Sequence, residues 1–323
     1  MLGATGTIGR ATVKALIEQG HEVVCFVRPA LAAQPAATPP AGRGLPEGVT
    51  VRHGNVFSPA SFSGDGIRGE PFDVLVSCMA SRTGVPCDAW AVDHQAHSIA
   101  LGVAKQAGIA QMVLLSAICV QKPLLEFQKA KLAFEAELIA SGLTYSIVRP
   151  TAFFKSLSGQ IDRVRKGKPF LLFGNGELTA CKPISDRDLG TFIASCVTDQ
   201  RLWNRVLPVG GPGPAITPRQ QGDKLFALLG LKQKYKRLPV AMMDVIIAAL
   251  SAAGRLSPRL RDKAELARIG RYYATESMLV LDSESGRYDE NLTPSYGSDT
   301  LFEFYEQVLR GEASIERGDH AVF

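Results

Sequence analysis

The sequence predicts an α/β fold with a doubly wound parallel sheet, followed by a smaller, mostly helical C-terminal region. Three observations support this prediction: a glycine motif at the start of the chain, an alternation of strand-like and helix-like segments up to residue 150, and a loss of that alternation afterwards. The 323 residues are enough for a large core domain and a second, smaller region.

The composition is that of an ordinary globular protein, because 46% of the residues are hydrophobic and 21% are charged. A net charge of +5 is too mild and too scattered to indicate binding to nucleic acid. No apolar stretch reaches the roughly 18 residues of a membrane-spanning helix, and no leader precedes the first motif, so we expect a cytoplasmic protein. The six cysteines include no C-x-x-C pair, which predicts a reducing compartment.

The glycine motif, G-x-x-G-x-x-G, spans residues 3–9 and precedes a helix-like segment over 10–19. Glycines let the backbone approach a pyrophosphate, and the free N–H groups at a helix start attract the anion. Residues 21–28 follow with the character of a buried parallel strand, at the spacing of a β-α-β unit. The combination predicts a dinucleotide site in a Rossmann fold.

The first strand of such a unit needs about 5–6 residues. Only Met1 and Leu2 precede the glycines. We therefore expect that the natural protein carries further apolar residues at its start, or that the recorded start codon is internal.

The end of the second strand bears on the choice of cofactor. An NAD enzyme places Asp or Glu there for the ribose 2′-hydroxyl, whereas this chain has Arg28. A guanidinium pairs well with a 2′-phosphate, so Arg28 favours NADPH over NADH, with a solvated strand-end arginine as the alternative.

The next elements follow in order along the chain. Residues 29–48 contain five prolines among alanines and glycines, which predicts a mobile loop beside the adenine. We expect further strands at 49–56, 72–80, 111–116 and 143–148, and helices at 89–106 and 126–140.

After residue 150 the alternation weakens. We therefore expect an NADP-binding core over 1–150, with 182–209 returning to it, and a substrate-binding region over 151–181 and 210–323. Thr217 followed by Pro218 predicts the start of a helix that continues to residue 229.

The segment after the fifth strand carries the candidate catalytic residues. Phe127 and Lys131 lie one turn apart on one helix face. Short-chain dehydrogenases carry Y-x-x-x-K here, with a tyrosine that transfers the proton and a lysine that holds the nicotinamide ribose. This chain keeps the lysine but has phenylalanine for tyrosine. The loss of the phenol favours reduction of a conjugated alkene, whose π-system spreads the charge and can take a proton later from water.

Together with the glycine motif, segments 116–137, 184–189 and 209–212 resemble the divinyl chlorophyllide 8-vinyl reductase family, an atypical, NmrA-like and isoflavone-reductase-like branch of the short-chain dehydrogenases. The resemblance covers nearly the whole chain. It implies an oxidoreductase that uses NADPH to reduce the C8 vinyl group of a 3,8-divinyl (proto)chlorophyllide to ethyl, in the chlorophyll or bacteriochlorophyll biosynthesis of a photosynthetic organism. The alternatives are an NADPH reductase of another conjugated alkene and a non-catalytic NmrA-type regulator, against which Lys131 argues.

The resemblance and the strand ends assign roles to single residues. Lys131 is expected to bind the nicotinamide ribose and supply positive potential, and Ser116 to orient the substrate or relay a proton. The expected cofactor-binding residues are Gly3, Thr5, Gly6, Thr7, Ile8 and Gly9 at the pyrophosphate, Arg28 at the 2′-phosphate, Asn55 and Val56 at the adenine, Cys78, Met79 and Ala80 at the ribose and nicotinamide, and Pro150, Thr151, Ala152 and Phe153 at the carboxamide. Phe153 and Phe154 are candidates for stacking on the tetrapyrrole, with core packing as the alternative.

A strongly apolar helix is expected over 240–254, with basic residues on both sides of it. Three roles fit this pattern: a lid over the pigment, a peripheral contact of 232–261 with the photosynthetic membrane, or a buried core helix. His94 and His97 share a helix face but lack a third ligand, so no metal site is predicted.

Overall fold

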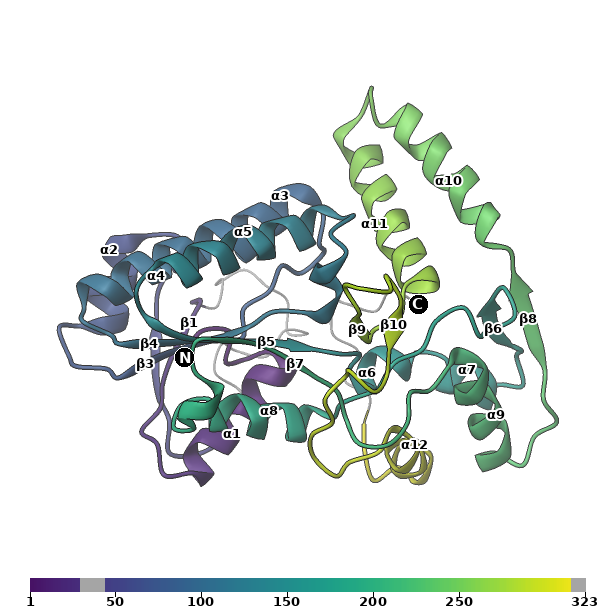
Figure 1. Ribbon diagram of the computed structural model, residues 1–323, viewed down its shortest axis with the longest axis horizontal. Coiled ribbons are helices and arrows are strands. Elements are labelled where there is room, and N and C mark those ends of the chain that lie inside the picture. Colours follow the sequence, from purple (N-terminus) through teal and green to yellow (C-terminus); the bar gives the residue numbers. More distant parts are fainter. Residues whose placement is uncertain (30–43, 315–323) are drawn as a thin grey trace.

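The structure, a computed structural model, describes residues 1–29 and 44–314 (Figure 1). Most of the loop expected over 29–48 therefore lies outside the described residues. The core is a parallel sheet of six strands, which are β1 (Val24–Val27), β2 (Thr50–His53), β3 (Val74–Ser77), β4 (Gln111–Leu115), β5 (Thr144–Pro150) and β7 (Arg205–Val209). These strands match the predicted segments and confirm the doubly wound parallel sheet.

Leu2 lies at the centre of the sheet, where it joins β1 to β3. Its backbone bridges Phe26 on one side and Ser77 on the other, and its N–H donates to the Val76 carbonyl oxygen at 2.9 Å. The strand order is therefore β2-β1-Leu2-β3-β4-β5-β7. The glycine motif begins directly after Leu2, at the point where the strand order reverses and such folds bind nucleotides.

Helices cover both faces of the sheet (Figure 1). One layer contains α1 (Thr7–Glu18) and α8 (Asp186–Ser195), and the other contains α4 (His97–Gln106) and α5 (Glu126–Ala140). The backbones of α1 and α8 approach closely at Gly190, since a Cβ there would lie 2.6 Å from the Ala11 carbonyl carbon.

Shorter elements complete this part of the chain. The helix expected over 89–106 begins earlier than predicted and is interrupted, because a π-helical turn stands between its two α-helical pieces. The shorter elements are α2 (Pro59–Ser61), η1 (Phe62–Ile67), α3 (Pro86–Ala89), the π-helical η2 (Trp90–Ala96), η3 (Ile118–Gln121) and η4 (Gln200–Leu202). Of these, α3 and η2 precede α4 in the interrupted helix.

The C-terminal region has its own core, in which Phe154, Leu225 and Tyr305 are buried together. Its predicted helix, α9 (Pro218–Leu228), starts as expected with a Thr217 cap and an N-terminal proline. The remaining elements of this core are α6 (Phe154–Leu157), α7 (Ile161–Arg165), the parallel pair β6 (Phe170–Phe173) and β8 (Tyr235–Leu238), and α12 (Leu301–Arg310).

A helical hairpin of α10 (Val240–Ala253) and α11 (Pro258–Thr275) projects from the molecule (Figure 1). No residue of α10 is buried, so the buried-core alternative for this helix is wrong. Helix α11 is tied to the sheet-covering layer, because Glu265 Oε1 accepts the Glu126 N–H at the start of α5 at 3.1 Å. The antiparallel strands β9 (Val280–Leu281) and β10 (Tyr288–Asp289) follow. Within residues 1–29 and 44–314, no helix has the length and apolar character needed to cross a membrane.

Candidate active site

The glycine loop and the strand ends meet at one edge of the sheet. Gly3 has a φ of +69°, and a Cβ there would lie 2.6 Å from the backbone of Cys78 after β3. A Cβ on Gly9 would lie 2.0 Å from the Gly3 carbonyl oxygen. The nearest atom to a Cβ on Gly6, in contrast, is 3.4 Å away. Gly3 and Gly9 are therefore required by the fold, whereas Gly6 leaves an open surface that suits a closely bound ligand.

The start of α1 is suited to an anion. Its N-terminus has no side-chain cap and no acidic residue in the first turn, so its free N–H groups and positive dipole end remain available. Lys155, at the start of α6, donates to Thr7 Oγ1 at 3.1 Å and adds a cation beside the loop. The residues present therefore fit the pyrophosphate of a dinucleotide.

Lys131 is held by a buried carboxylate. Its Nζ lies 2.9 Å from Asp93 Oδ1, with side chains that are 11% and 0% exposed, respectively. Asp93 Oδ1 also accepts the Ser81 N–H at 3.1 Å, while Asp93 Oδ2 is buried without a hydrogen-bond partner. Because an ammonium has three N–H donors, the ion pair fixes the position of Lys131 and leaves donors for a ligand.

Asp93 lies in the π-helical turn η2. Single π-helical turns are frequent at functional sites. The ring of Phe127, one turn before Lys131, is buried against the residues of a small core that includes Cys119 and Ile269. The residue at the sequence position of the short-chain dehydrogenase tyrosine is therefore a buried ring without a hydroxyl.

A neutral histidine supports the end of β3. His97 is 1% exposed, and its burial, together with the nearby Lys131 charge, lowers its pKa to about 4. Its Nδ1 lies 2.9 Å from the Val92 carbonyl oxygen, which assigns the proton to Nδ1, and Nε2 then accepts from Ser77 Oγ at 2.9 Å. Ser77 is thereby fixed next to Cys78 and Met79.

Ser116 is tied to a buried ion pair. Its Oγ donates to Glu135 Oε1 at 2.5 Å, and Arg149 donates to both oxygens of Glu135. Ser116, Lys131, Asp93 and His97 border one small space that does not admit a water molecule. The hydroxyl of Ser116 is therefore bound to Glu135 within the protein, and Ser116 borders the same space as Lys131.

The remaining predicted residues are placed as follows. Arg28 follows β1 and is exposed, without a partner among the described residues. Asn55 is exposed after β2, whereas the Val56 side chain is buried in the core. Phe153 is half-buried. Phe154 is 4% exposed, and its ring centroid lies 5.6 Å from that of Phe304. Its side chain therefore packs in the core, as the alternative interpretation expected.

Thr151, Pro150 and Ala80 lie at the same edge of the sheet as the glycine loop, at or beyond the carboxyl ends of their strands. Thr151 is buried, and its N–H donates to the Val209 carbonyl oxygen at 3.0 Å. Pro150 ends β5 and Ala80 is exposed beyond β3. No group of three or more His, Cys, Asp and Glu side chains that could hold a metal ion occurs in the described parts of the chain.

Three charged residues of the site were not predicted from the sequence: Asp93, Glu135 and Lys155. Asp93 and Lys131 are 38 positions apart, and Lys155 and Thr7 are 148 apart, so only the fold brings them together. An acid in a helix with an apolar face was the available signal for Asp93.

Comparisons with known proteins agree with this geometry. Residues 3–200 match a family model described as NAD(P)H-binding. The chloroplastic divinyl chlorophyllide a 8-vinyl-reductase of Oryza sativa subsp. indica is 48% identical over 335 residues, covering 99% of this chain and 81% of the relative.

Two solved structures share the fold. An NADPH-dependent quinone oxidoreductase from Escherichia coli, complexed with NADPH, has a TM-score of 0.67 at 19% identity, covering 95% of this chain and 98% of that one. The leucoanthocyanidin reductase–NADPH complex from Vitis vinifera has a TM-score of 0.66 at 14% identity, covering 96% and 98%.

Proposed function

Because the chain belongs to the divinyl chlorophyllide a 8-vinyl-reductase family, we propose that it reduces the 8-vinyl group of a divinyl chlorophyllide to an ethyl group with NADPH. The protein is an NADPH-dependent oxidoreductase of chlorophyll biosynthesis. The observation that carries the proposal is the 48% identity over nearly the full chain. The Lys131–Asp93 pair beside a buried Phe127 supports it from the site.

The chain's own residues provide the cofactor site. Gly6 and the free N–H groups of α1 bind the pyrophosphate, and Lys155 lies close enough to add its positive charge. The exposed Arg28 binds the 2′-phosphate. Beyond these residues, Asn55 and the Val56 backbone border the adenine, and Cys78, Met79, Ala80, Pro150, Thr151, Ala152 and Phe153 line the nicotinamide side.

NADPH supplies the hydride when it is bound. Asp93 positions Lys131 so that its remaining N–H donors reach a ribose hydroxyl, and its charge stabilises negative charge that develops on the substrate. Since no tyrosine stands before Lys131, the conjugated macrocycle spreads the charge and the proton arrives from water. Ser116, whose hydroxyl donates to Glu135, orients the substrate or relays a proton in this scheme.

We also propose that residues 151–181 and 210–323 form the substrate-binding region. The elements α6, β9 and β10 lie beyond the carboxyl ends of β5 and β7 (Figure 1). Phe153, at the start of α6, is half-buried and follows the strand that carries the nicotinamide-side residues. Its ring is therefore the aromatic candidate for contact with the pigment.

Incubation with NADPH and divinyl chlorophyllide tests the reaction. We expect a blue shift of the Soret band with NADPH consumption; nucleotide binding without turnover would instead identify a regulator. Lys131→Ala is expected to lower kcat by about 100-fold. The matched control is Lys129→Ala, an exposed lysine on the same helix that pairs with Glu126, and it should keep normal turnover. Equal activities of the two variants would contradict the role of Lys131.

We further propose that residues 232–261 contact a membrane surface peripherally. The α10 side chains of Met242, Val245 and Ile246 are 43%, 69% and 44% exposed and share one helix face. The segment contains seven basic residues and one acidic residue. An exposed apolar face with basic flanks is typical of helices that bind anionic lipid surfaces.

Sedimentation with phosphatidylglycerol vesicles at low salt tests this contact. The Val245→Ser/Ile246→Ser variant should bind these vesicles less tightly than the wild type, because two exposed apolar side chains are lost without a change in charge. A wild type that does not sediment with vesicles would exclude the membrane contact.

A further inference from the structure

A cavity of about 190 Å³ lies between the two helices of the hairpin, near its tip. It is lined by Ser251, Gly254, Arg255, Arg261, Ala264 and Arg268. Gly254 brings the helices together, since a Cβ there would lie 3.1 Å from the Arg261 Cα. Three of the six lining residues are arginines, and none carries a carboxylate.

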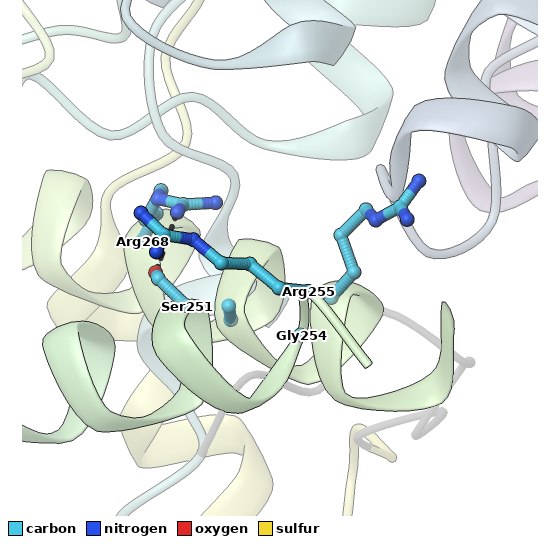
Figure 2. A pocket seen from close by; sticks show the side chains of 6 residues that line it. Ser251, Gly254, Arg255 and Arg268 are labelled. Atoms are coloured by element: carbon cyan, nitrogen blue, oxygen red, sulfur yellow. Dashed lines mark hydrogen bonds between the residues drawn. The ribbon is translucent and has the colours of Figure 1, made fainter. Parts of the chain in front are cut away.

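Arg268 is a fixed wall of this cavity. Its Nη2 donates to Ser251 Oγ at 2.7 Å, drawn as a dashed line in Figure 2, and its Nη1 donates to Glu265 Oε2 at 3.0 Å. Glu265 is buried and is also bound by the start of α5. The guanidinium therefore keeps its place without a ligand.

Arg255 and Arg261 differ from Arg268, because neither has a hydrogen-bond or ion-pair partner in the part of the chain that the structure describes. Arg255 leaves the backbone beside Gly254 (Figure 2). The 18-residue helix α11 begins close by and has no acid in its first turn, so its dipole adds positive potential. Three guanidinium groups with only one carboxylate among their partners suit an oxyanion, and the planar fork of arginine suits phosphate oxygens.

We propose that this cavity binds the phosphate of an anionic phospholipid head group. The inference rests on the membrane contact proposed above for residues 232–261. Leu256, between the two helices, is 91% exposed at the tip, so a tip that enters the head-group layer would bring lipid phosphates to Arg255 and Arg261. The apolar face of α10 and the cavity then contact the same surface.

Two double variants distinguish specific binding of a lipid phosphate in the cavity from general electrostatic attraction of the basic segment to an anionic membrane. Arg255→Gln/Arg261→Gln removes the two unpartnered guanidinium groups of the cavity. Arg237→Gln/Arg259→Gln removes the same charge from exposed arginines of the same segment that do not line it. General attraction predicts a loss of about 30-fold in affinity for phosphatidylglycerol vesicles in both. We expect a further loss of at least about 10-fold in the cavity variant alone, and equal losses would overturn the proposal.

A second arm uses inorganic phosphate on the full chain with NADP⁺ saturating the cofactor site. Phosphate should raise the unfolding temperature of the wild type and the control variant above that in chloride of equal ionic strength, and this rise should be lost in the cavity variant. An equal rise of the unfolding temperature in the wild type and both variants would overturn the proposal that the cavity binds phosphate.

The outcomes separate the cavity from the membrane contact. The wild type could be stabilised by phosphate through the cavity and still bind no vesicles. In that case the cavity would remain an anion site, but the proposal that its anion comes from a lipid would be overturned. A higher KM for divinyl chlorophyllide in the cavity variant, with unchanged vesicle binding, would assign the cavity to the carboxylate of the pigment instead.

Discussion

The three glycines of the loop are needed for different reasons. Gly3 adopts a backbone conformation that other residues rarely take, and Gly9 lies against the Gly3 carbonyl oxygen. Gly6 has neither constraint, because its missing side chain leaves an open surface. The fold thus accounts for two glycines, and the third is the one proposed to contact the ligand.

Gly6→Ala is expected to fold normally but to bind NADPH at least about 10-fold more weakly, since a methyl group would stand where the pyrophosphate approaches. Circular dichroism and cofactor titration measure the two effects. The contrasting variant is Gly9→Ala, whose Cβ would lie 2.0 Å from the Gly3 oxygen, and it should be destabilised. Normal NADPH affinity in Gly6→Ala would remove the pyrophosphate from this surface.

Arg28→Ala should raise the KM for NADPH by about 10-fold or more and leave the KM for NADH nearly unchanged, because only NADPH carries the 2′-phosphate. Steady-state kinetics with both cofactors measure the difference. Arg205→Ala, an exposed arginine at the start of β7, is the control. Equal changes for both cofactors would contradict the phosphate role.

Single residues could be predicted from the sequence only where a motif or the end of a predicted strand pointed to them. Lys131 was predicted because its spacing from Phe127 matches a known pattern. Asp93, which fixes Lys131, belongs to no local pattern and depends on the packing of η2 against α5. Partners that are distant in sequence are set by tertiary structure, which periodicity does not encode.

Among the elements, those with strong local signals were predicted best. The helix over 126–140 was predicted with the bounds that the structure gives to α5. Helix α12 was missed, although its Thr300–Glu303 capping box is a sequence signal. The pair β6–β8 was also missed, since its strands lie more than 60 positions apart and Tyr235–Leu238 is largely exposed.

Two glycine substitutions in helices should have opposite effects. Gly190→Ala in α8 should lower the free energy of unfolding by about 1–3 kcal/mol, because the methyl group would meet the α1 backbone. Gly102→Ala in α4 should raise it by up to about 1 kcal/mol, because Gly102 has open space around it and alanine favours the helix. Urea unfolding measures both. A stabilising Gly190→Ala would show that α1 and α8 are not in close contact.

For the whole molecule, the predicted fold class is confirmed, whereas the division into a cofactor-binding core and a substrate-binding region stays a prediction. The strands up to residue 150 follow from the alternating pattern, and β7 pairs with β5 within the segment 182–209 that was expected to return to the core. The projecting hairpin does not follow from that pattern, because composition alone cannot distinguish an apolar helix in a core from one that is exposed. The cytoplasmic location stays a prediction.

Acid should destabilise the whole fold through His97. Its pKa is about 4 in the folded protein and about 6.5 when exposed, so the unfolded chain binds the proton first as the pH falls. The free energy of unfolding should therefore decrease from pH 6.5 toward 4, with a loss of about 2 kcal/mol at pH 5 from this residue. Urea unfolding at pH 7 and 5 measures it.

His97→Gln should reduce this pH dependence, whereas His94→Gln, a half-buried neighbour on the preceding turn that pairs with Glu137, should keep it. An unchanged pH dependence in His97→Gln would assign the acid sensitivity to other groups.

The hydrogen bond between Glu265 and the Glu126 amide connects the hairpin mechanically to α5. It attaches the hairpin, near the middle of α11, to the first turn of the helix that bears Lys131. The hairpin cannot rotate freely. A rotation that moves Glu265 away would leave the Glu126 N–H at the start of α5 without its acceptor, at a cost of about 1 kcal/mol. A force on the tip is thereby transmitted to the neighbourhood of the ammonium group.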